Sequence, residues 1–314
     1  MELTLTNDAD EVRGLMAAGW CPVECSIGGE SLVDSLVMDH HGPRSDLECV
    51  AIRAYRDHFG VRRADRRFVG VGTADADMSF AIAALSGMLP HPDAAVPSGG
   101  LAEVWTRDWS DLAALIGRMD TDPIGLDLTQ VAQGPLLMLW HALVGQATDS
   151  LRGAAAVHAW TSLLTAPPDR LAPLLTATLE VERQRIAQAR EDLDERGLEL
   201  DGVLLVMGAR GWGFDVWYGR DEGLGGDVAA AWQHPVVMRW DGGDGAVTLG
   251  CPNKAVAEAI FGAGGLLTVF PALEPNGWGG REAVGGSPRG LQMTEAMVMA
   301  AARRVAELCG SCRP

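Results

Sequence analysis

The spacing of apolar and polar residues predicts strands followed by helices in the first part of the chain. "SLVMDHHG", residues 35–42, runs from apolar residues into an aspartate and two histidines, the pattern of a buried strand with a polar tip. "RFVGVGTADAD", residues 67–77, is a second β-rich run that ends in acids, and "MSFAIAALSG", residues 78–87, is an apolar helix ending at Gly87. This order predicts a parallel sheet with helices on both faces, in which ligands bind beyond the carboxyl ends of the strands.

A helix is also predicted at residues 45–60, after the first of these strands. Ser45 and Glu48 have the spacing of a capping box, and Gly60 provides the stop. A third apolar run, "LAALIGRMDTD" at residues 112–122, closes on acids and is expected to resemble the two strands before it.

The second part of the chain has a different sequence pattern. "LAPLLTATLEVERQRIAQAREDLDERG", residues 171–197, is rich in helix formers and charge, and predicts a long connecting helix. Beyond it, β-rich pieces are expected at 201–221, 234–252 and 264–273, and helices at 253–265 and 294–310. The predicted class is therefore α/β. A domain at 1–165 is joined by a helix at 166–197 to a smaller mixed α/β domain at 198–314.

The net charge and the hydropathy of the chain argue against a long nucleic acid as partner and against a membrane-spanning segment. The formal net charge is −17, so the surface repels the phosphate backbone of a long nucleic acid. The apolar runs are too short to cross a membrane, and the polar, acidic start of the chain does not have the pattern of a signal peptide. We therefore expect a cytoplasmic protein with a small-molecule partner, and leave a homodimer open.

Acidic residues close each of the three apolar runs: Asp39 with two histidines, Asp75 with Asp77, and Asp120 with Asp122. Taken singly, an aspartate at a strand end is most often a turn former or a helix cap. In one parallel sheet, however, the three ends would lie on the same edge, and carboxylates that close repel one another unless a divalent cation joins them. Mixed carboxylate and imidazole ligands favour Mn²⁺, Fe²⁺, Co²⁺ or Zn²⁺.

"VMDHHG" together with "GTADADMSFAIAAL" resembles the DHH phosphoesterase superfamily. That family includes manganese-dependent pyrophosphatases, single-strand exonucleases, oligoribonucleases and cyclic-dinucleotide phosphodiesterases. The resemblance implies one or two divalent ions, most simply Mn²⁺, that activate water against phosphorus. It implies metal ligation by Asp39, His40, Asp75, Asp77 and Asp120, and a catalytic role for Asp39, His40 and His41.

"GWGGREAVGGSPRG", residues 277–290, is similar to the Gly-rich substrate-binding segment of the DHH-associated C-terminal domain. Glycines let backbone N–H groups approach phosphate oxygens, and arginines add bidentate contacts. A flexible turn is the alternative interpretation of such a segment. The substrate contacts implied by the resemblance are Gly279, Gly280, Arg281, Gly285, Gly286, Ser287 and Arg289.

Two features differ from the family pattern. The Asp-His-His motif precedes the Asp-x-Asp motif here, whereas the family has the opposite order. The family also carries a histidine four residues before the first aspartate, and this chain has Val71 there. Replacement ligands could come from Asp122, Asp149 or His91.

These patterns lead to three hypotheses. The first is a metal-dependent phosphoesterase that acts at the interface of two domains on a dinucleotide, a short oligonucleotide, a nucleoside phosphate or pyrophosphate. The second is a catalytically inactive protein of the same fold that senses a nucleotide or a metal. The third is a zinc or redox protein that uses Cys21, Cys25, Cys309 and Cys312. Trp212 and Trp217 are candidates for stacking on a base, with the hydrophobic core as the preferred interpretation.

Overall fold

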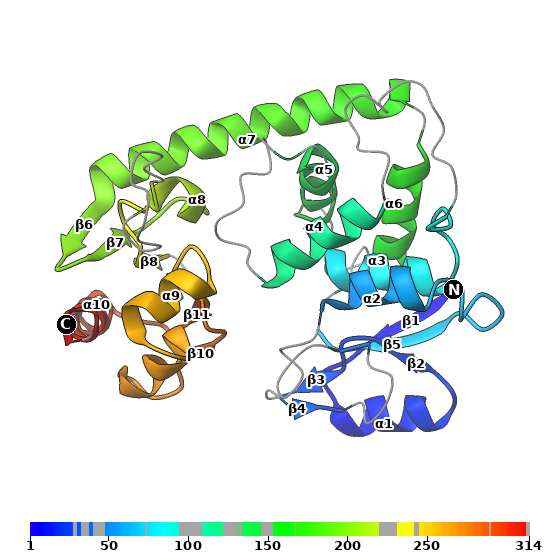
Figure 1. The fold of residues 1–314 in the computed structure, drawn as a ribbon, viewed down its shortest axis with the longest axis horizontal. Helices are drawn as coiled ribbons and strands as arrows, with labels where there is room; N and C mark the ends of the chain where they lie inside the picture. Colours follow the sequence, from blue (N-terminus) through cyan, green and yellow to red (C-terminus); the bar gives the residue numbers. More distant parts are fainter. Residues whose placement is uncertain are drawn as a thin grey trace. The chain divides into compact units, whose positions relative to one another are not determined.

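The computed structural model describes residues 1–27, 30–32, 38–39, 48–72, 74–93, 109–121, 131, 134–145, 153–166, 168–219, 231–241, 245–288 and 290–311. The chain divides into two compact units. The described residues up to Thr121 and from Val131 to Leu179 belong to the first unit, and those from Glu180 onward belong to the second. Figure 1 shows the helices and strands of each.

A three-stranded parallel sheet organises the first unit, in the order β1-β5-β2. Strand β1 is Glu2–Leu5, β5 is Arg67–Gly70 and β2 is Cys21–Pro22. The register places Glu2 beside Arg67 and Pro22 beside Val69. Because both neighbours run parallel to β5, all three strands have their carboxyl ends at one edge, which agrees with the predicted parallel sheet.

Helices cover both faces of this sheet. Helix α1 (Ala9–Ala17) lies on one side, and helices α2 (Val50–Asp57) and α3 (Ala76–Leu85) lie on the other (Figure 1). Every residue of α3 is buried, so it is a core helix. A small hairpin, β3 (Ser26–Ile27) and β4 (Glu30–Ser31), follows β2.

The predicted capping box at Ser45 and Glu48 is wrong. Helix α2 begins at Val50, its N-cap is Cys49, and Glu48 lies before the helix. The helix ends at Asp57, before the predicted stop at Gly60. The Cys49 side chain makes no capping hydrogen bond, so the first turn of α2 needs an acceptor from elsewhere in the fold.

Among its described residues the first unit also contains α4 (Trp109–Thr121), α5 (Gly134–Gly145) and α6 (Ala154–Thr165). Trp140 of α5 and Trp160 of α6 stack with ring centroids 4.8 Å apart. The indole N–H of Trp160 donates to the carbonyl of Ala76 over 3.3 Å. This buried tryptophan pair therefore fixes the start of α3, where Asp75 and Asp77 lie.

Helix α7 (Pro168–Arg196) has 29 residues and contributes its first part to one unit and its second part to the other. Proline suits its first position, because a backbone N–H has no helical partner there. The predicted long helix is present. No described helix in the chain is both long enough and apolar enough to cross a membrane.

The second unit contains a six-stranded mixed sheet in the order β10-β11-β9-β8-β7-β6. Its strands are β6 (Gly197–Leu200), β7 (Val203–Met207), β8 (Val237–Trp240), β9 (Val247–Gly250), β10 (Gly279–Gly280) and β11 (Val284–Gly286). Strands β7 and β8 are parallel, and the other neighbours are antiparallel. Asp201 and Gly202 form the two-residue turn between β6 and β7 with φ of 45° and 93°, as a tight hairpin requires. The parallel first sheet, the mixed second sheet and the long helix confirm the predicted α/β class.

Helices α8 (Phe214–Trp217), α9 (Lys254–Phe261) and α10 (Glu295–Ser311) belong to this unit. Two expectations of β structure are wrong here. "GGLLTVFPAL" forms two 3₁₀ turns, η4 (Gly265–Thr268) and η5 (Phe270–Ala272), and "FDVW" forms α8. Leu266, Val269 and Phe270 still join the hydrophobic core, which explains why their spacing resembles that of a buried strand.

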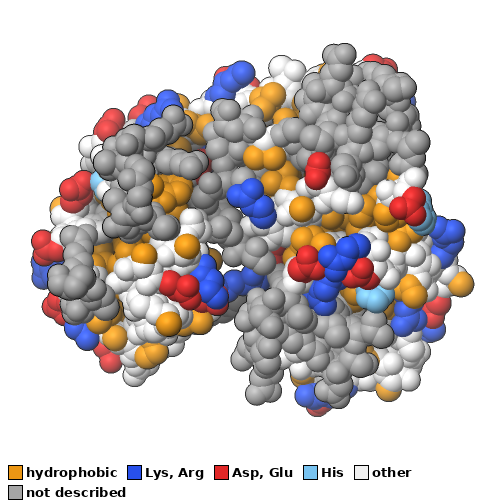
Figure 2. All heavy atoms as spheres, viewed as in Figure 1, with side chains coloured by type: hydrophobic (Ala, Val, Ile, Leu, Met, Phe, Trp, Pro, Cys, Tyr) orange, Lys and Arg blue, Asp and Glu red, His pale blue; other side chains and the backbone are white. Residues whose placement is uncertain are grey.

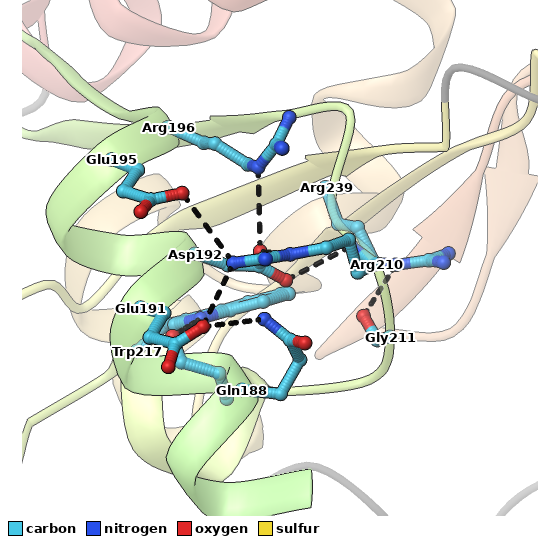
Figure 3. Close-up of polar contacts among 10 residues, drawn as sticks. Gln188, Glu191, Asp192, Glu195, Arg196, Arg210, Gly211, Trp217 and Arg239 are labelled. Carbon is cyan, nitrogen blue, oxygen red and sulfur yellow. Dashed lines mark hydrogen bonds and ion pairs between the residues drawn. The ribbon is translucent and has the colours of Figure 1, made fainter.

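A buried aspartate ties the end of α7 to the loop after β7. The Asp192 side chain accepts from Arg210 Nε over 2.6 Å and from the Arg210 backbone N–H over 2.9 Å. Figure 3 shows Asp192 between Arg210 and Arg196, whose Nε lies 3.4 Å from the same carboxylate. In the same view, Arg239 donates to the carbonyl of Gly211 over 3.0 Å. The Arg210 contacts hold the loop "GARGWG" against α7, and the Arg239 contact joins it to β8.

Candidate functional site

Strand β2 leads directly to a buried glutamate at the carboxyl edge of the first sheet. After Pro22 the pairing with β5 continues for one more bond, from the Val23 N–H to the Val69 carbonyl over 2.9 Å. Glu24 follows and donates its backbone N–H to the carbonyl of Met38 over 2.6 Å. Glu24 exposes 6% of its surface and has a φ of 52°, a left-handed conformation that is uncommon for a residue other than glycine.

Strand β5 leads to the Asp-x-Asp motif at the start of helix α3. Asp75 is the N-cap of α3, and its carboxylate accepts from the Met78 N–H over 3.0 Å. Asp77 is 1% exposed, and its carboxylate accepts from the Ala51 N–H over 2.7 Å. Asp77 therefore satisfies the first turn of α2, which Cys49 leaves uncapped.

Asp39 lies at the same edge of the sheet. It is fully buried, and its carboxylate accepts from the Ser26 hydroxyl over 2.8 Å. The Arg53 guanidinium donates to the carbonyl of Asp39 over 2.9 Å and to that of Glu48 over 2.8 Å. Arg53 thereby links the residues on both sides of the 40–47 segment. His40 and His41, predicted as ligand and catalytic residue, lie outside the described residues.

Asp120 reaches the cluster in a way that differs from its prediction. The run "LAALIGRMD" is part of helix α4, so Asp120 lies in the last turn of a helix and does not follow a strand. Its charge nevertheless acts on Glu24, as do the charges of Asp75 and Asp39. The charges of Asp39, Asp75 and Asp120 thus all act on Glu24, and Asp120 does so from a helix. Asp122 lies outside the described residues.

The electrostatics of this cluster follow from burial and like charge. Burial and the charges of Asp75, Asp120 and Asp39 raise the pKa of Glu24 well above its usual value, and a hydrogen bond with Asp77 opposes the rise. Carboxylates this close cannot all be ionised cheaply unless a cation is present. Oxygen donors of this type suit a hard divalent cation such as Mg²⁺ or Mn²⁺.

Two cysteines border the acids. Burial, with the charges of Asp39 and Glu24 among the further causes, raises the pKa of Cys25 to about 12. Burial and the charge of Asp77 raise the pKa of Cys49 as well. Both thiols are therefore protonated at neutral pH, which makes them poor metal ligands and poor nucleophiles.

The described side chains do not form a complete metal shell by themselves. Within the part of the chain that the structure describes, no three His, Cys, Asp or Glu side chains have the arrangement of a metal site. Of the suggested replacement ligands, Asp122 and Asp149 lie outside the described residues. His91 is exposed, and its Nδ1 accepts from the Asp93 N–H over 3.2 Å, so it is engaged in a local turn. The donor types fit a divalent cation, and the described donors would have to draw together to bind it.

Val71 stands where the family pattern has a histidine. Its side chain packs with Val12, Val69 and Cys25 in a small hydrophobic cluster against α1. Position 71 is therefore part of the apolar packing of the sheet.

The Gly-rich segment near the C-terminus forms the β10–β11 hairpin, which pairs with β9. A Cβ at Gly280 would overlap the carbonyl of Val284, and one at Gly285 would overlap the ring of Phe270. These two glycines are explained by close packing alone. A Cβ at Gly279 would meet nothing within 4 Å, so the backbone there is open to a ligand.

Of the other residues predicted to contact the substrate, Ser287 and Arg281 make hydrogen bonds within the second unit. The Ser287 hydroxyl accepts from the Val247 N–H over 3.0 Å, and Arg281 donates its backbone N–H to Val284 over 2.7 Å. A Cβ at Gly286 would lie 3.0 Å from the carbonyl of Val247. Arg289 lies outside the described residues.

Trp217 is a core residue, in agreement with the preferred interpretation. It is fully buried in α8, and its indole N–H donates to the carbonyl of Ala189 over 2.8 Å. Trp212 is 41% exposed and lies 4.8 Å, between ring centroids, from Phe214. Cys309, one of the candidate zinc or redox residues, is buried in the hydrophobic core of the second unit. Cys312 lies outside the described residues.

Charged side chains are spread over the face in Figure 2. Several of the described Lys and Arg side chains there lie beside Asp and Glu side chains.

No family model matches the chain, and no curated protein matches it. Among solved structures, a pGpG-specific phosphodiesterase, PggH from Vibrio cholerae, aligns over 67% of this chain and 69% of its own, with 13% identity and a TM-score of 0.39. RecJ from Thermus thermophilus, solved with Mg²⁺, aligns over 99% of this chain with 17% identity and a TM-score of 0.36. This chain spans 50% of the RecJ chain. Both likenesses are low.

Proposed function

We propose that this protein is a divalent-metal-dependent phosphoesterase that hydrolyses a phosphodiester, phosphomonoester or phosphoanhydride bond in a small substrate. One observation carries the proposal. The charges of Asp39, Asp75 and Asp120, which come from three separate segments, all act on one buried carboxyl, that of Glu24. Acids that interact in this way are unfavourable without a cation, which supports the proposal.

The proposed metal ligands are Asp39, His40, Asp75, Asp77 and Asp120, holding one or two Mn²⁺ ions. A divalent cation there supplies positive charge to the phosphoryl oxygens and makes water a stronger nucleophile. Three of the proposed ligands accept hydrogen bonds within the chain: Asp77 from the Ala51 N–H, Asp39 from the Ser26 hydroxyl, and Asp75 from the first turn of α3.

The histidines and Arg53 complete the proposed machinery. His41 is proposed to contact the phosphoryl group, and Asp39 and His40 to orient the attacking water. The Arg53 guanidinium, held between the carbonyls of Asp39 and Glu48, positions the residues that flank the two histidines. Its positive charge also offsets part of the negative charge of Asp77 and Asp39.

The substrate is proposed to be a dinucleotide, a short oligonucleotide, a nucleoside phosphate or pyrophosphate. The acidic surface disfavours longer polyanions. The hairpin that contains Gly279 and Arg281 is proposed to bind a distal phosphate, with Gly280, Gly285, Gly286, Ser287 and Arg289 as the other members of this proposed contact set. The open space above Gly279 supports close approach of a ligand to the backbone.

A second candidate is a non-catalytic protein that binds a nucleotide or a metal as a signal. Val71 favours it, because a ligand position of the family is here part of an apolar cluster. Both candidates bind a ligand at this site, and only the phosphoesterase hydrolyses it.

The test is a metal titration followed by a hydrolysis screen. Protein treated with EDTA is titrated with Mn²⁺ and Mg²⁺ by calorimetry, then assayed with each metal on dinucleotides, nucleoside phosphates and pyrophosphate. The phosphoesterase predicts metal binding and phosphate release that Asp75→Asn removes, whereas Asp10→Asn on the exposed face of α1 leaves both intact. Binding of a nucleotide or a metal without turnover supports the sensor. Absence of metal binding rules out the phosphoesterase, and absence of both metal and nucleotide binding rules out the sensor as well.

A further inference from the structure

Trp212 does not follow the core packing of the other aromatic residues in the second unit. Of the Trp, Tyr and Phe side chains whose exposure the structure describes, it is the one that is exposed, at 41%, whereas Trp217 in the next helix is fully buried. A single exposed apolar side chain is ordinary on a protein surface. What sets Trp212 apart is the way in which its loop, residues 208–213, is held.

Two arginines hold the main chain of this loop at Trp212. Arg239 donates to the carbonyl of Gly211 over 3.0 Å (Figure 3), and Arg185 donates to the carbonyl of Trp212 itself over 2.7 Å. Arg185 is fixed in turn by Asp215, whose carboxylate accepts from it over 2.7 Å. Hydrogen bonds from charged donors are stronger than neutral ones. The backbone that carries Trp212 is therefore positioned before a ligand binds, which lowers the entropy cost of binding.

One side of the Trp212 ring is supported, and space is left beside it. Phe214, which is fully buried, packs against Trp212 with ring centroids 4.8 Å apart and an angle of 48° between the rings. A Cβ at Gly213 would overlap the side chain of Ala189 in α7, whereas one at Gly211 would meet nothing within 4 Å. The loop thus lies close to α7 at Gly213 and is open at Gly211, so a planar ligand can reach the accessible part of Trp212.

The position and the charges of the loop indicate the kind of ligand. The loop follows β7, which runs parallel to β8, so it lies at the carboxyl end of this pair, where α/β sheets bind ligands. The arginines beside it are engaged with carboxylates: Arg185 with Glu182 and Asp215, and Arg210 with Asp192. A phosphate would have to compete with these carboxylates, whereas a neutral, planar group would not.

We propose that Trp212 stacks on the base of a nucleotide substrate. The faces of a nucleobase are planar and uncharged, and aromatic side chains bind them by stacking. Within residues 208–213, all of which the structure describes, only Arg210 and Trp212 are exposed. This surface matches one ring and falls far short of the roughly 800 Å² per partner of a stable protein interface. The inference rests on the proposed function and narrows its substrates to those that carry a base, which excludes pyrophosphate.

The experiment compares AMP with ribose 5-phosphate, which has a hydroxyl group in place of the base. Equilibrium dialysis measures the binding of both compounds in Mn²⁺ and in EDTA, for wild type and three variants. Trp212→Ala removes the ring, and Trp212→Phe retains a ring that can stack. Leu198→Ala is the matched control, because Leu198 is 40% exposed in the same unit. Tryptophan fluorescence with added AMP and the melting temperature are recorded for each protein.

Wild type is expected to bind AMP more tightly than ribose 5-phosphate. Trp212→Ala weakens AMP binding by about fivefold or more, leaves ribose 5-phosphate binding unchanged and keeps the wild-type melting temperature. Trp212→Phe retains most of the AMP affinity but loses the fluorescence change that AMP causes in wild type, and Leu198→Ala matches wild type throughout. If Trp212→Ala does not fold, Trp212→Phe decides: AMP binding without the wild-type fluorescence change supports the stacking role, and an unchanged fluorescence response overturns it.

Unchanged AMP affinity in Trp212→Ala overturns the inference, as does a wild type that binds AMP no better than ribose 5-phosphate. Equal losses for both compounds with a lower melting temperature would identify a structural role and overturn it too. A wild-type dimer in gel filtration that Trp212→Ala converts to a monomer, with AMP binding unchanged, would identify a protein contact instead.

The inference and the proposed function can fail separately. Trp212-dependent AMP binding in a protein that hydrolyses no substrate defeats the proposed function and leaves the Trp212 assignment in place. Metal-dependent hydrolysis of a nucleotide with the same KM in wild type and Trp212→Ala does the reverse.

Discussion

The carboxylate of Asp77, in the first turn of helix α3, accepts a hydrogen bond from the backbone N–H of Ala51, in the first turn of helix α2, over 2.7 Å. Cys49, the N-cap of α2, has no side-chain capping bond. Asp77 therefore does for α2 what an N-cap residue normally does, and its negative charge lies near the positive end of that helix. One proposed metal ligand is thus also a structural residue.

This double role predicts different effects for two substitutions of Asp77. Asp77→Ala removes the acceptor and lowers the free energy of unfolding by about 1–2 kcal/mol. Asp77→Asn retains an acceptor oxygen, so its metal-free stability lies above that of Asp77→Ala. Both variants weaken Mn²⁺ binding, because each removes a charged donor. Urea unfolding in EDTA and calorimetry with Mn²⁺ measure the two effects separately. Equal stability of the two variants would contradict the capping role.

The Asp192–Arg210 contact predicts a stability effect in the second unit. Asp192 is fully buried and receives two hydrogen bonds from Arg210. Asp192→Ala leaves the Arg210 backbone N–H without this acceptor and is expected to cost about 1–3 kcal/mol of unfolding free energy. Glu180→Ala on the same helix breaks an exposed ion pair and is expected to change it by less than about 0.5 kcal/mol. Similar unfolding curves for the two variants would show that the buried Asp192–Arg210 hydrogen bonds do not stabilise the protein.

The β10–β11 hairpin allows the packing role of its glycines to be separated from a binding role. Gly285→Ala would force a Cβ against Phe270 and to 2.5 Å from the carbonyl of Gly279, with an expected cost of about 1–3 kcal/mol. Gly279→Ala meets open space, so stability is expected to stay near that of wild type. If the hairpin binds phosphate through its backbone, Gly279→Ala lowers substrate affinity without lowering the melting temperature. Unchanged affinity in this variant would remove Gly279 from the substrate contacts.

His234 predicts a pH dependence in the second unit. It is 8% exposed, and burial lowers its pKa below the ordinary 6.5, while Glu199 partly opposes this. The folded state then binds fewer protons than the unfolded state below pH 6.5, so stability is lost as the pH falls through that region. Replacing His234 by Gln removes this contribution. Urea unfolding at pH 7.5 and pH 5 should show the wild-type protein losing more stability on acidification than the variant. An equal loss would contradict the prediction.

The sequence predicted the elements whose pattern is unambiguous. Arg67–Gly70 is a strand, the apolar stretch after Asp75 is a buried helix, and the charged run up to Arg196 is a long helix. In each case local propensity and burial favour the same structure. The acids at the end of β5 could therefore be placed correctly at the edge of a sheet.

The failures have physical reasons. In the run that ends at Asp120, the buried residues Leu112, Ala113, Leu115 and Ile116 have helical spacing, but a short apolar run fits a strand equally well. The 3₁₀ turns near Phe270 pose the same ambiguity. Glu24 gave no signal at all, because a single glutamate in "CPVECS" belongs to no motif. Only the pairing of β2 with β5 brings it to Asp77.

Helix α7 has a practical consequence for dividing the protein into parts. The boundary between the units falls between Leu179 and Glu180, inside a continuous helix, so no natural linker exists there at which to cut. A fragment ending at that point would expose helical carbonyl groups that normally have partners, and its complement would begin with unpaired N–H groups. Buried residues on both sides, such as Leu175 and Ala189, anchor their own halves of the helix. Truncations intended to isolate either half should therefore retain all of Pro168–Arg196.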